Sequence, residues 1–448
     1  MSGREAAGDA GGGLARELGV LGATMMGLGS IIGTGIFVSI GIATGVAGPS
    51  VVVAIVAAAG LAVCNALSSA QLAASHPTSG GTYEYGYVYL NPWLGFAAGW
   101  MFLCAKSASA ATAALGFAGY TLVALGAPDS AWRVVLALAA VVGLTGLVLS
   151  GLRRSSAANI IIVSVTLSAL VFFVVAGLPA AVRSGEEHFR AFFESPSGDV
   201  RSPIVRLLEA TALMFVAYTG YGRVATMGEE VRSPRTTIPR AIVLALVAAM
   251  VLYAAVGAVG VGAAGAAVFG SVGTERAAPL AVVASGFGVP GAGVVLSVGA
   301  VTAMLGVLLN LILGLSRVAL AMGRRGDLPA AVARVSGWRG VPVNAVLLVG
   351  AVIFVLTAVG NIRLAWSLSA FTVLVYYAVT NLAALRLPRE RRLFHPAIAW
   401  VGLAGCLGLA FWVQPRAWGA GVCILAVGLV GRALLRRRGG RGDGAGAA

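Results

Sequence analysis

Long apolar stretches dominate this sequence and restrict what it can fold into. Twelve runs of mostly apolar residues follow one another, separated by short polar connections. A run of about 18 or more such residues crosses the hydrocarbon core of a bilayer as an α-helix. The sequence therefore predicts an all-α polytopic membrane protein with twelve transmembrane helices. We expect these helices at about residues 19–46, 48–74, 93–125, 131–151, 157–181, 203–228, 239–263, 278–321, 342–360, 364–386, 395–413 and 416–435.

The charged residues support this fold class and indicate an orientation. They make up only 10% of the 448 residues, whereas soluble domains carry about 25%. The net charge of +15 comes from arginines in short connections and in the tail, for example Arg153, Arg324, Arg391 and Arg436. Basic residues favour cytoplasmic loops. We therefore expect both termini in the cytoplasm, an integral protein of the plasma (inner) membrane, and contact with lipid rather than with nucleic acid.

The first apolar run contains a segment that is poorly suited to a continuous helix. Residues 29–37 read GSIIGTGIF, with three glycines and two hydroxyl residues. Glycine is a poor helix former, and in a bilayer each unpaired backbone N–H or C=O group costs several kcal/mol unless protein or a cavity satisfies it. A break at this depth therefore indicates a binding site.

A second segment of this kind lies in the sixth run, where residues 215–222 read FVAYTGYG. Breaks in spans 1 and 6 predict two five-helix units. Because five helices separate the breaks, the units must cross the membrane in opposite directions, as in transporters built from inverted repeats. The alternative is that small residues only permit close helix packing. The predicted divisions are a cytoplasmic tail at 1–18, repeats at 19–181 and 203–386, helices 11 and 12 at 395–435, and a disordered cytoplasmic tail at 436–448.

Four groups of residues form motifs that follow one another along the chain. The first is residues 29–37, which fit G-[SA]-I-I-G-[TA]-G-I-F. The second, after span 2 and into span 3, comprises Pro77, Ser79, Gly80, Gly81, Tyr83, Tyr85, Gly95, Phe96, Gly99 and Trp100. The third, in and after span 6, comprises Phe215, Ala217, Tyr218, Gly220, Tyr221, Glu229, Glu230, Pro234, Ile238, Pro239, Arg240, Ala241 and Ile242. The fourth, after span 8, comprises Ser316, Arg317, Ala321, Met322, Gly326, Leu328, Pro329, Pro342 and Ala345.

In these motifs and their order the chain resembles the amino acid–polyamine–organocation (APC) superfamily of permeases over about residues 20–390. The resemblance implies a five-plus-five inverted repeat with discontinuous helices 1 and 6. It also implies a secondary active transporter for amino acids, with the substrate held at the two breaks.

The two breaks predict how an amino acid is held. Residues 33–35 open the second half of span 1, where free N–H groups at a helix N-terminus suit a carboxylate. Carbonyl groups at the end of the first half and in span 6 suit an ammonium group, and the resemblance implies the same arrangement. Phe215 and Tyr221 are candidate gates or ordinary packing residues. The predicted substrate-binding residues are Ser30, Ile31, Ile32, Gly33, Thr34, Gly35, Phe215, Ala217, Tyr218, Thr219, Gly220 and Tyr221.

Lys106 is the only lysine in the chain and lies inside span 3. An ionisable residue inside a membrane indicates function by default, and burial disfavours the charged form of a lysine, which favours proton coupling. We expect Lys106 to supply a titratable or fixed charge near the substrate. The alternative is a structural lysine paired with a carbonyl group or with Glu209. Some proton-coupled relatives carry a lysine in span 5, where this sequence has Thr166, so it departs from their pattern.

Arg223 is a further candidate for coupling or selectivity. It follows the second break and either faces the substrate or braces the second half of span 6. Glu209, about two turns before the break, either gates the outside or pairs with one of these bases. If Lys106 and Arg223 both face the pocket, it is electropositive and disfavours cationic amino acids.

These features predict a secondary active transporter that moves amino acids by alternating access with proton coupling. The alternatives on the same scaffold are an amine or polyamine permease and an amino acid exchanger. An enzyme is not expected, because the spans lack clustered acid, base or metal-binding residues, so no catalytic or metal-ligating residue is assigned. We expect no cofactor beyond a proton gradient, with sodium left open. The expected partners are a small amino acid or amine and the lipid bilayer.

Overall fold

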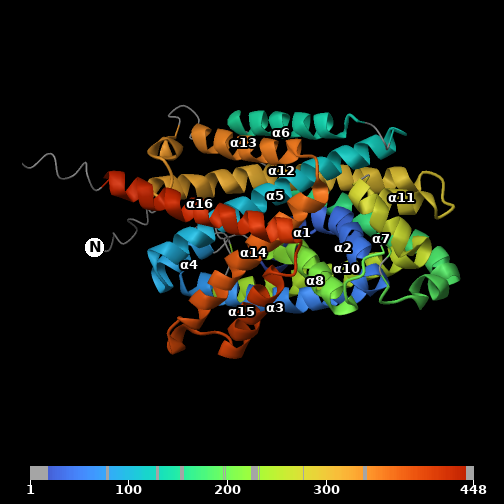
Figure 1. Cartoon of the computed structure of the whole chain (residues 1–448), viewed down its shortest axis with the longest axis horizontal. Coiled ribbons are helices and arrows are strands. Elements are labelled where there is room, and N and C mark those ends of the chain that lie inside the picture. Colours follow the sequence, from blue (N-terminus) through green and yellow to red (C-terminus); the bar gives the residue numbers. More distant parts are fainter. Residues whose placement is uncertain are drawn as a thin grey trace, which may run out of the picture.

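The computed structural model describes residues 19–76, 80–127, 131–151, 156–194, 196, 198–222, 231, 233–275, 277–335 and 341–439. Within these ranges every regular element is helical (Figure 1). The α-helices are α1 (Val20–Ile31), α2 (Ile40–Ala47), α3 (Val51–Ser75), α4 (Thr82–Tyr89), α5 (Pro92–Ala124), α6 (Arg133–Leu149), α7 (Ser156–Arg190), α8 (Pro203–Tyr218), α10 (Pro234–Glu275), α11 (Pro279–Ser285), α12 (Ala292–Arg324), α13 (Val343–Ala358), α14 (Ile362–Leu385), α15 (Pro396–Ala410) and α16 (Pro415–Gly439). A π-helical turn η1 (Gly35–Ser39) and 3-10 turns η2 (Gly48–Ser50), η3 (Thr219–Tyr221), η4 (Ala330–Ala333) and η5 (Arg389–Arg391) complete them.

Length and composition identify helices that can cross a membrane. Eight helical segments of the described chain are long and apolar enough to do so. Four shorter apolar helices accompany them: α1, α6, α13 and α15. The chain is therefore an all-helical integral membrane protein, while the predicted total of twelve spans and the inverted repeat stay predictions.

Local sequence signals explain where several long helices begin. The side chain of Asn91 accepts hydrogen bonds from the backbone N–H groups of Trp93 and Leu94, at 3.0 and 2.9 Å, and Pro92 occupies the first turn of α5. Asn361 caps α14 in the same way. Such caps satisfy N–H groups that have no partner inside the helix.

The structure differs from the predicted boundaries in four places. The loop after span 2 contains the short helix α4, and a separate helix α11 precedes α12. Helices α7 and α10 run well past the predicted ends at 181 and 263. In α10 the extension is possible because Gly265 has φ +77°, a value that glycine adopts without strain, and the helix bends there.

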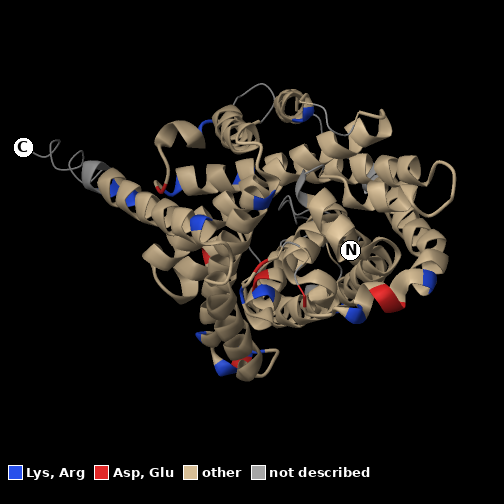
Figure 2. Ribbon diagram, turned by 45° about the vertical axis from the view of Figure 1, so that its right-hand side comes forward, with Lys and Arg blue, Asp and Glu red and all other residues tan. Residues whose placement is uncertain are grey.

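Helix α5 occupies the middle of the bundle, where it packs against α12 and α14 (Figure 1). Its buried side is built largely of alanine and glycine, which let neighbouring helices approach closely. Helix α10 packs against α7, α2 and α3, and α6 pairs with α13 at one edge of the bundle. Figure 2 shows that charged side chains gather near helix ends, with long uncharged stretches of ribbon between them.

Candidate functional site

The first apolar run is broken where the glycine-rich motif predicts. Helix α1 ends at Ile31, Ile32 is extended (φ −79°, ψ 111°), and a helix resumes at Gly35 as η1 and continues into α2. Thr34 precedes η1; it is only 4% exposed, and its hydroxyl oxygen has no hydrogen-bond partner. The first N–H groups of a helix also lack partners within it. This break therefore presents unsatisfied polar groups in the middle of the membrane-spanning bundle.

The second break, where α8 gives way to η3, lies directly against the first. A Cβ atom added at Gly220 would lie 2.1 Å from the carbonyl oxygen of Ser30. One added at Gly35 would lie 2.5 Å from the Cβ of Ala217. Real Cβ atoms do not come this close to a neighbour, so glycine is needed at both positions. The two discontinuous segments thus touch through their backbones.

A tyrosine from a third helix bonds to both breaks. The hydroxyl of Tyr253, on α10, donates to the carbonyl oxygen of Ile31 at 2.8 Å and lies 3.3 Å from that of Ala217. These carbonyls are among those predicted to receive an ammonium group, and each keeps a second lone pair beside Tyr253. Sequence reasoning missed Tyr253, because one tyrosine in an apolar run carries no signal of its own.

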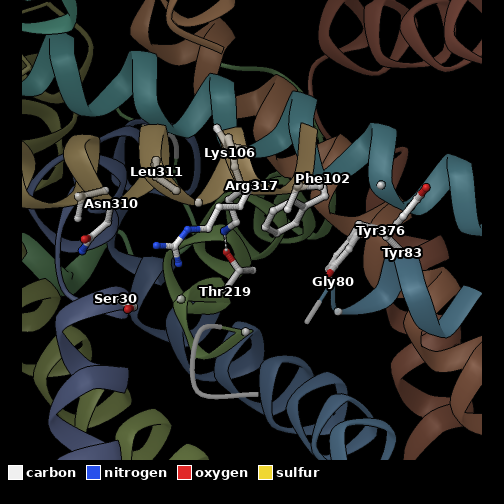
Figure 3. Close-up of a pocket in the computed structure, with 18 of the residues that line it drawn as sticks. Ser30, Gly80, Tyr83, Phe102, Lys106, Thr219, Asn310, Leu311, Arg317 and Tyr376 are labelled. Carbon is white, nitrogen blue, oxygen red and sulfur yellow. Dashed lines mark hydrogen bonds between the residues drawn. The ribbon is translucent and has the colours of Figure 1, made fainter. Parts of the chain in front are cut away.

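A cavity of about 310 Å³ lies beside the breaks, among residues of α1, α5, α12 and α14 (Figure 3). The residues that line it include Ser30, Phe102, Lys106, Thr219, Asn310 and Arg317. A smaller pocket of about 50 Å³ continues between the breaks. The pocket is bounded by Ile31, Gly33, Thr34, Gly35, Ala217 and Gly220.

Lys106 lies where the cavity and the pocket meet and lines both of them. Its Nζ donates a hydrogen bond of 2.8 Å to Oγ1 of Thr219, and this hydroxyl donates in turn to the carbonyl of Val216 at 2.7 Å. Figure 3 shows Lys106 and Arg317 pointing into the same space. Of the residues that the structure describes, none that lines the cavity or the pocket is acidic.

Some predicted site residues lie away from this space. Phe215, Tyr218 and Tyr221 are fully buried and do not line the cavity or the pocket, and Ile32 is also buried outside them. The rings of Phe215 and Tyr221 pack against Tyr377 on α14, with centroids 5.7 and 5.4 Å apart. The closeness of these residues to the break in the sequence could not predict that they point away from the cavity, because side chains around a turn point in different directions. Arg223, Glu229 and Glu230 lie outside the described residues.

Glu209 pairs with arginines rather than with Lys106, so the alternative in which Lys106 pairs with Glu209 is wrong. Its fully buried carboxylate lies 2.8 Å from Arg201 and 3.3 Å from Arg363. Arg201 also bonds to Asp199, and that hydrogen bond lowers the pKa of the Asp199 carboxyl to about 2. The cluster joins the start of α8 to the start of α14, at the end of the bundle opposite the cavity mouth. The carboxylate of Glu209 therefore connects α8 to α14 through Arg363.

A second cluster of charged and phenolic groups lies beside the cavity mouth. Tyr83 and Tyr87, on α4, both donate to Oδ2 of Asp327, the first at 2.8 Å. Arg432, on α16, donates from Nε to Oδ1 of Asp327 at 2.8 Å, and both charged side chains are almost fully buried. We call Tyr83, Tyr87, Asp327 and Arg432 the mouth cluster. It ties α4, the loop after α12 and α16 together.

Comparison with known proteins agrees with this geometry. Residues 18–427 match the family described as amino acid permease. The chain belongs to the amino acid permease family. It is therefore a transporter rather than an enzyme, as the APC resemblance implies.

Three relatives illustrate the range of this family. The permease is 40% identical over 438 residues to an uncharacterized transporter of Mycobacterium tuberculosis, and the match covers 95% of this chain and 93% of the relative. It is 30% identical over 339 residues to the branched-chain amino acid permease BcaP of Bacillus subtilis, covering 72% and 70%. It is 27% identical over 341 residues to cationic amino acid transporter 3, mitochondrial, of Arabidopsis thaliana, covering 72% and 54%.

Proposed function

We propose that the permease moves amino acids across the plasma (inner) membrane by alternating access, using twelve spans arranged as a five-plus-five inverted repeat. The observation that carries this proposal is the direct contact between the two breaks, with a small pocket between them. Broken helices that meet in the middle of a bundle are typical of the binding sites of secondary transporters. The family and its transporter relatives support the same conclusion.

The pocket offers complementary groups for both ends of an amino acid. The start of η1, with the unpartnered hydroxyl of Thr34, suits the α-carboxylate. The carbonyls of Ile31 and Ala217 suit the ammonium group, because each has a lone pair besides the one that faces Tyr253. A bound zwitterion thus gives the Thr34 hydroxyl a hydrogen-bond partner and uses the second lone pairs of the Ile31 and Ala217 carbonyls.

The positions of the cavity and of the Glu209 ion pairs fit one state of an alternating-access cycle. The cavity lies toward the end of α12 and the loop before α4, where Arg317 and Gly80 line it, and we expect this side to be cytoplasmic. At the opposite end, Glu209 pairs with Arg201 and Arg363, and Nε1 of Trp366 donates to the carbonyl of Leu213 at 2.9 Å. With the termini in the cytoplasm, this is an inward-open form closed on the outside.

Uptake into proteoliposomes tests the proposed function. Purified protein is reconstituted, and accumulation of a mixture of radiolabelled amino acids and amines is measured with and without a pH gradient. We expect amino acids to accumulate, more strongly with an inward proton gradient. If no member of the mixture accumulates or exchanges, the proposed function is wrong.

We further propose that Lys106 carries the proton. Its place between cavity and pocket and its bond to Thr219 at the second break link its charge to the substrate site. In Lys106→Met, uptake driven by a proton gradient is expected to fall to the level seen without one. In Lys106→Arg, which keeps the charge but does not release its proton, transport is expected to lose its pH dependence. Wild-type pH profiles in both variants would exclude this role.

A further inference from the structure

We infer that the permease selects amino acids whose side chain carries a second carboxylate, with Lys106 as the residue that recognises it. This inference rests on the proposed function, since it names the substrate class of the same site. It begins with the charge of the space that the substrate enters. Lys106 and Arg317 line the cavity, and the described lining holds no carboxylate to balance them.

Lys106 lacks a negative partner in the part of the chain that the structure describes. Its bond goes to the neutral hydroxyl of Thr219. The carboxylates of the surrounding elements are engaged elsewhere: Glu84 pairs with Arg325, Glu209 with Arg201, and Asp327 with Arg432. A charge inside a membrane is stable only when it is paired or hydrated. An anionic side chain of the substrate supplies the missing partner.

The position of Lys106 suits contact with a side chain rather than with the α-carboxylate. Thr34 and Gly35 line only the small pocket, whereas Lys106 lines the pocket and also the larger cavity next to it. A substrate held by its α-carboxylate at η1 extends its side chain out of the pocket, past Lys106. A second carboxylate at that point receives a charge-assisted hydrogen bond, which is stronger than the neutral bond to Thr219.

Arg317 extends the positive region toward the cavity mouth. It lies about two turns beyond Asn310 on α12, and it lines the cavity but not the pocket. In the described part of the structure its guanidinium has no carboxylate within ion-pair distance. Clefts lined by one sign of charge attract ligands of the opposite sign and speed their association. Arg317 thus draws anionic amino acids toward Lys106.

The test compares acids with their amides of nearly equal shape. Exchange by proteoliposomes is measured at equal pH on both sides with glutamate, glutamine, aspartate, asparagine and arginine, so that a loss of proton coupling does not affect the result. We expect each acid to be preferred to its amide by at least about tenfold in kcat/KM. We expect arginine to be excluded.

Variants assign the preference to particular side chains. Lys106→Met is expected to remove the preference for acids, so that kcat/KM for glutamate and aspartate falls to that for glutamine and asparagine, and its thermal unfolding temperature in detergent shows whether the variant is folded. Lys106→Arg is expected to retain the preference. Arg317→Met is expected to raise the KM for glutamate several-fold at low salt and less at high salt. Arg324→Met, an exposed arginine on the same helix that does not line the cavity, is the matched control.

The outcomes separate this inference from the proposed function. Exchange of glutamine or asparagine without glutamate or aspartate overturns the inference and leaves the proposed function standing. An unchanged preference in Lys106→Met also overturns it. If none of the five amino acids is exchanged, the inference is overturned, and the uptake experiment with the broad mixture decides the proposed function separately.

Discussion

Gly220→Ala is expected to lower the rate of transport by at least about tenfold. The added Cβ would lie 2.1 Å from the carbonyl oxygen of Ser30 and 2.5 Å from the backbone nitrogen of Ile31. Neither atom belongs to a flexible side chain, so the α1 segment must move away from η3. That movement opens the pocket between the breaks. Overpacking of this kind typically costs about 1–3 kcal/mol.

The measurement is the initial rate of amino acid uptake by proteoliposomes that hold equal amounts of folded protein. Gly143→Ala is the matched control, because Gly143 is exposed on α6 and a Cβ there would meet nothing within 4 Å. It should transport at the wild-type rate. Wild-type uptake by Gly220→Ala would mean that contact between the breaks is not needed for transport.

Asp327→Asn is expected to cause the largest loss of stability among single polar substitutions in the described chain. Asp327 is fully buried and accepts bonds from Tyr83, Tyr87 and Arg432. The substitution leaves Arg432, which is 1% exposed, without its counter-ion. Removing one partner of a buried pair costs about 3–5 kcal/mol. We therefore expect a clear fall in the thermal unfolding temperature in detergent.

Two further variants distinguish the ion pair from a general effect of substitution near the cavity mouth. Glu84→Gln breaks a partly exposed ion pair with Arg325. This change is expected to lower the free energy of unfolding by no more than about 1 kcal/mol. The double variant Asp327→Leu/Arg432→Met removes both charges and is expected to have a higher unfolding temperature than Asp327→Asn, because no buried charge is left unpaired. An unfolding temperature for Asp327→Asn equal to that of Glu84→Gln would show that the mouth cluster does not stabilise the fold.

Sequence patterns predict the helices and the breaks because these depend on neighbouring residues. The apolar runs indicate which segments enter the bilayer, and the glycines at 33, 35 and 220 indicate where a helix is interrupted. Ser30 and Gly35, which belong to this motif, line one side of the small pocket. Local sequence therefore predicts where the main chain of the candidate site is interrupted.

The partners that complete the site could not be predicted in this way, because they come from distant helices. Asp327 and Arg432 are 105 residues apart, and Tyr253 is 222 residues from Ile31. Of the two roles considered for Glu209, a gate on the outside or a partner of Lys106 or Arg223, neither names the arginines that its carboxylate faces, Arg201 and Arg363. Which face of a helix a residue occupies is set by packing, and a continuous apolar run gives no periodicity from which to read that face.

The single lysine allows the permease to be labelled at one known position. Because Lys106 is the only lysine in the sequence and is partly exposed within the cavity, an amine-reactive reagent meets a single lysine ε-amine, and that amine lines the cavity. The extent of acylation at Lys106 thus reports how often the cavity is open. Protection by a bound solute reports occupancy without any engineered cysteine or fluorophore.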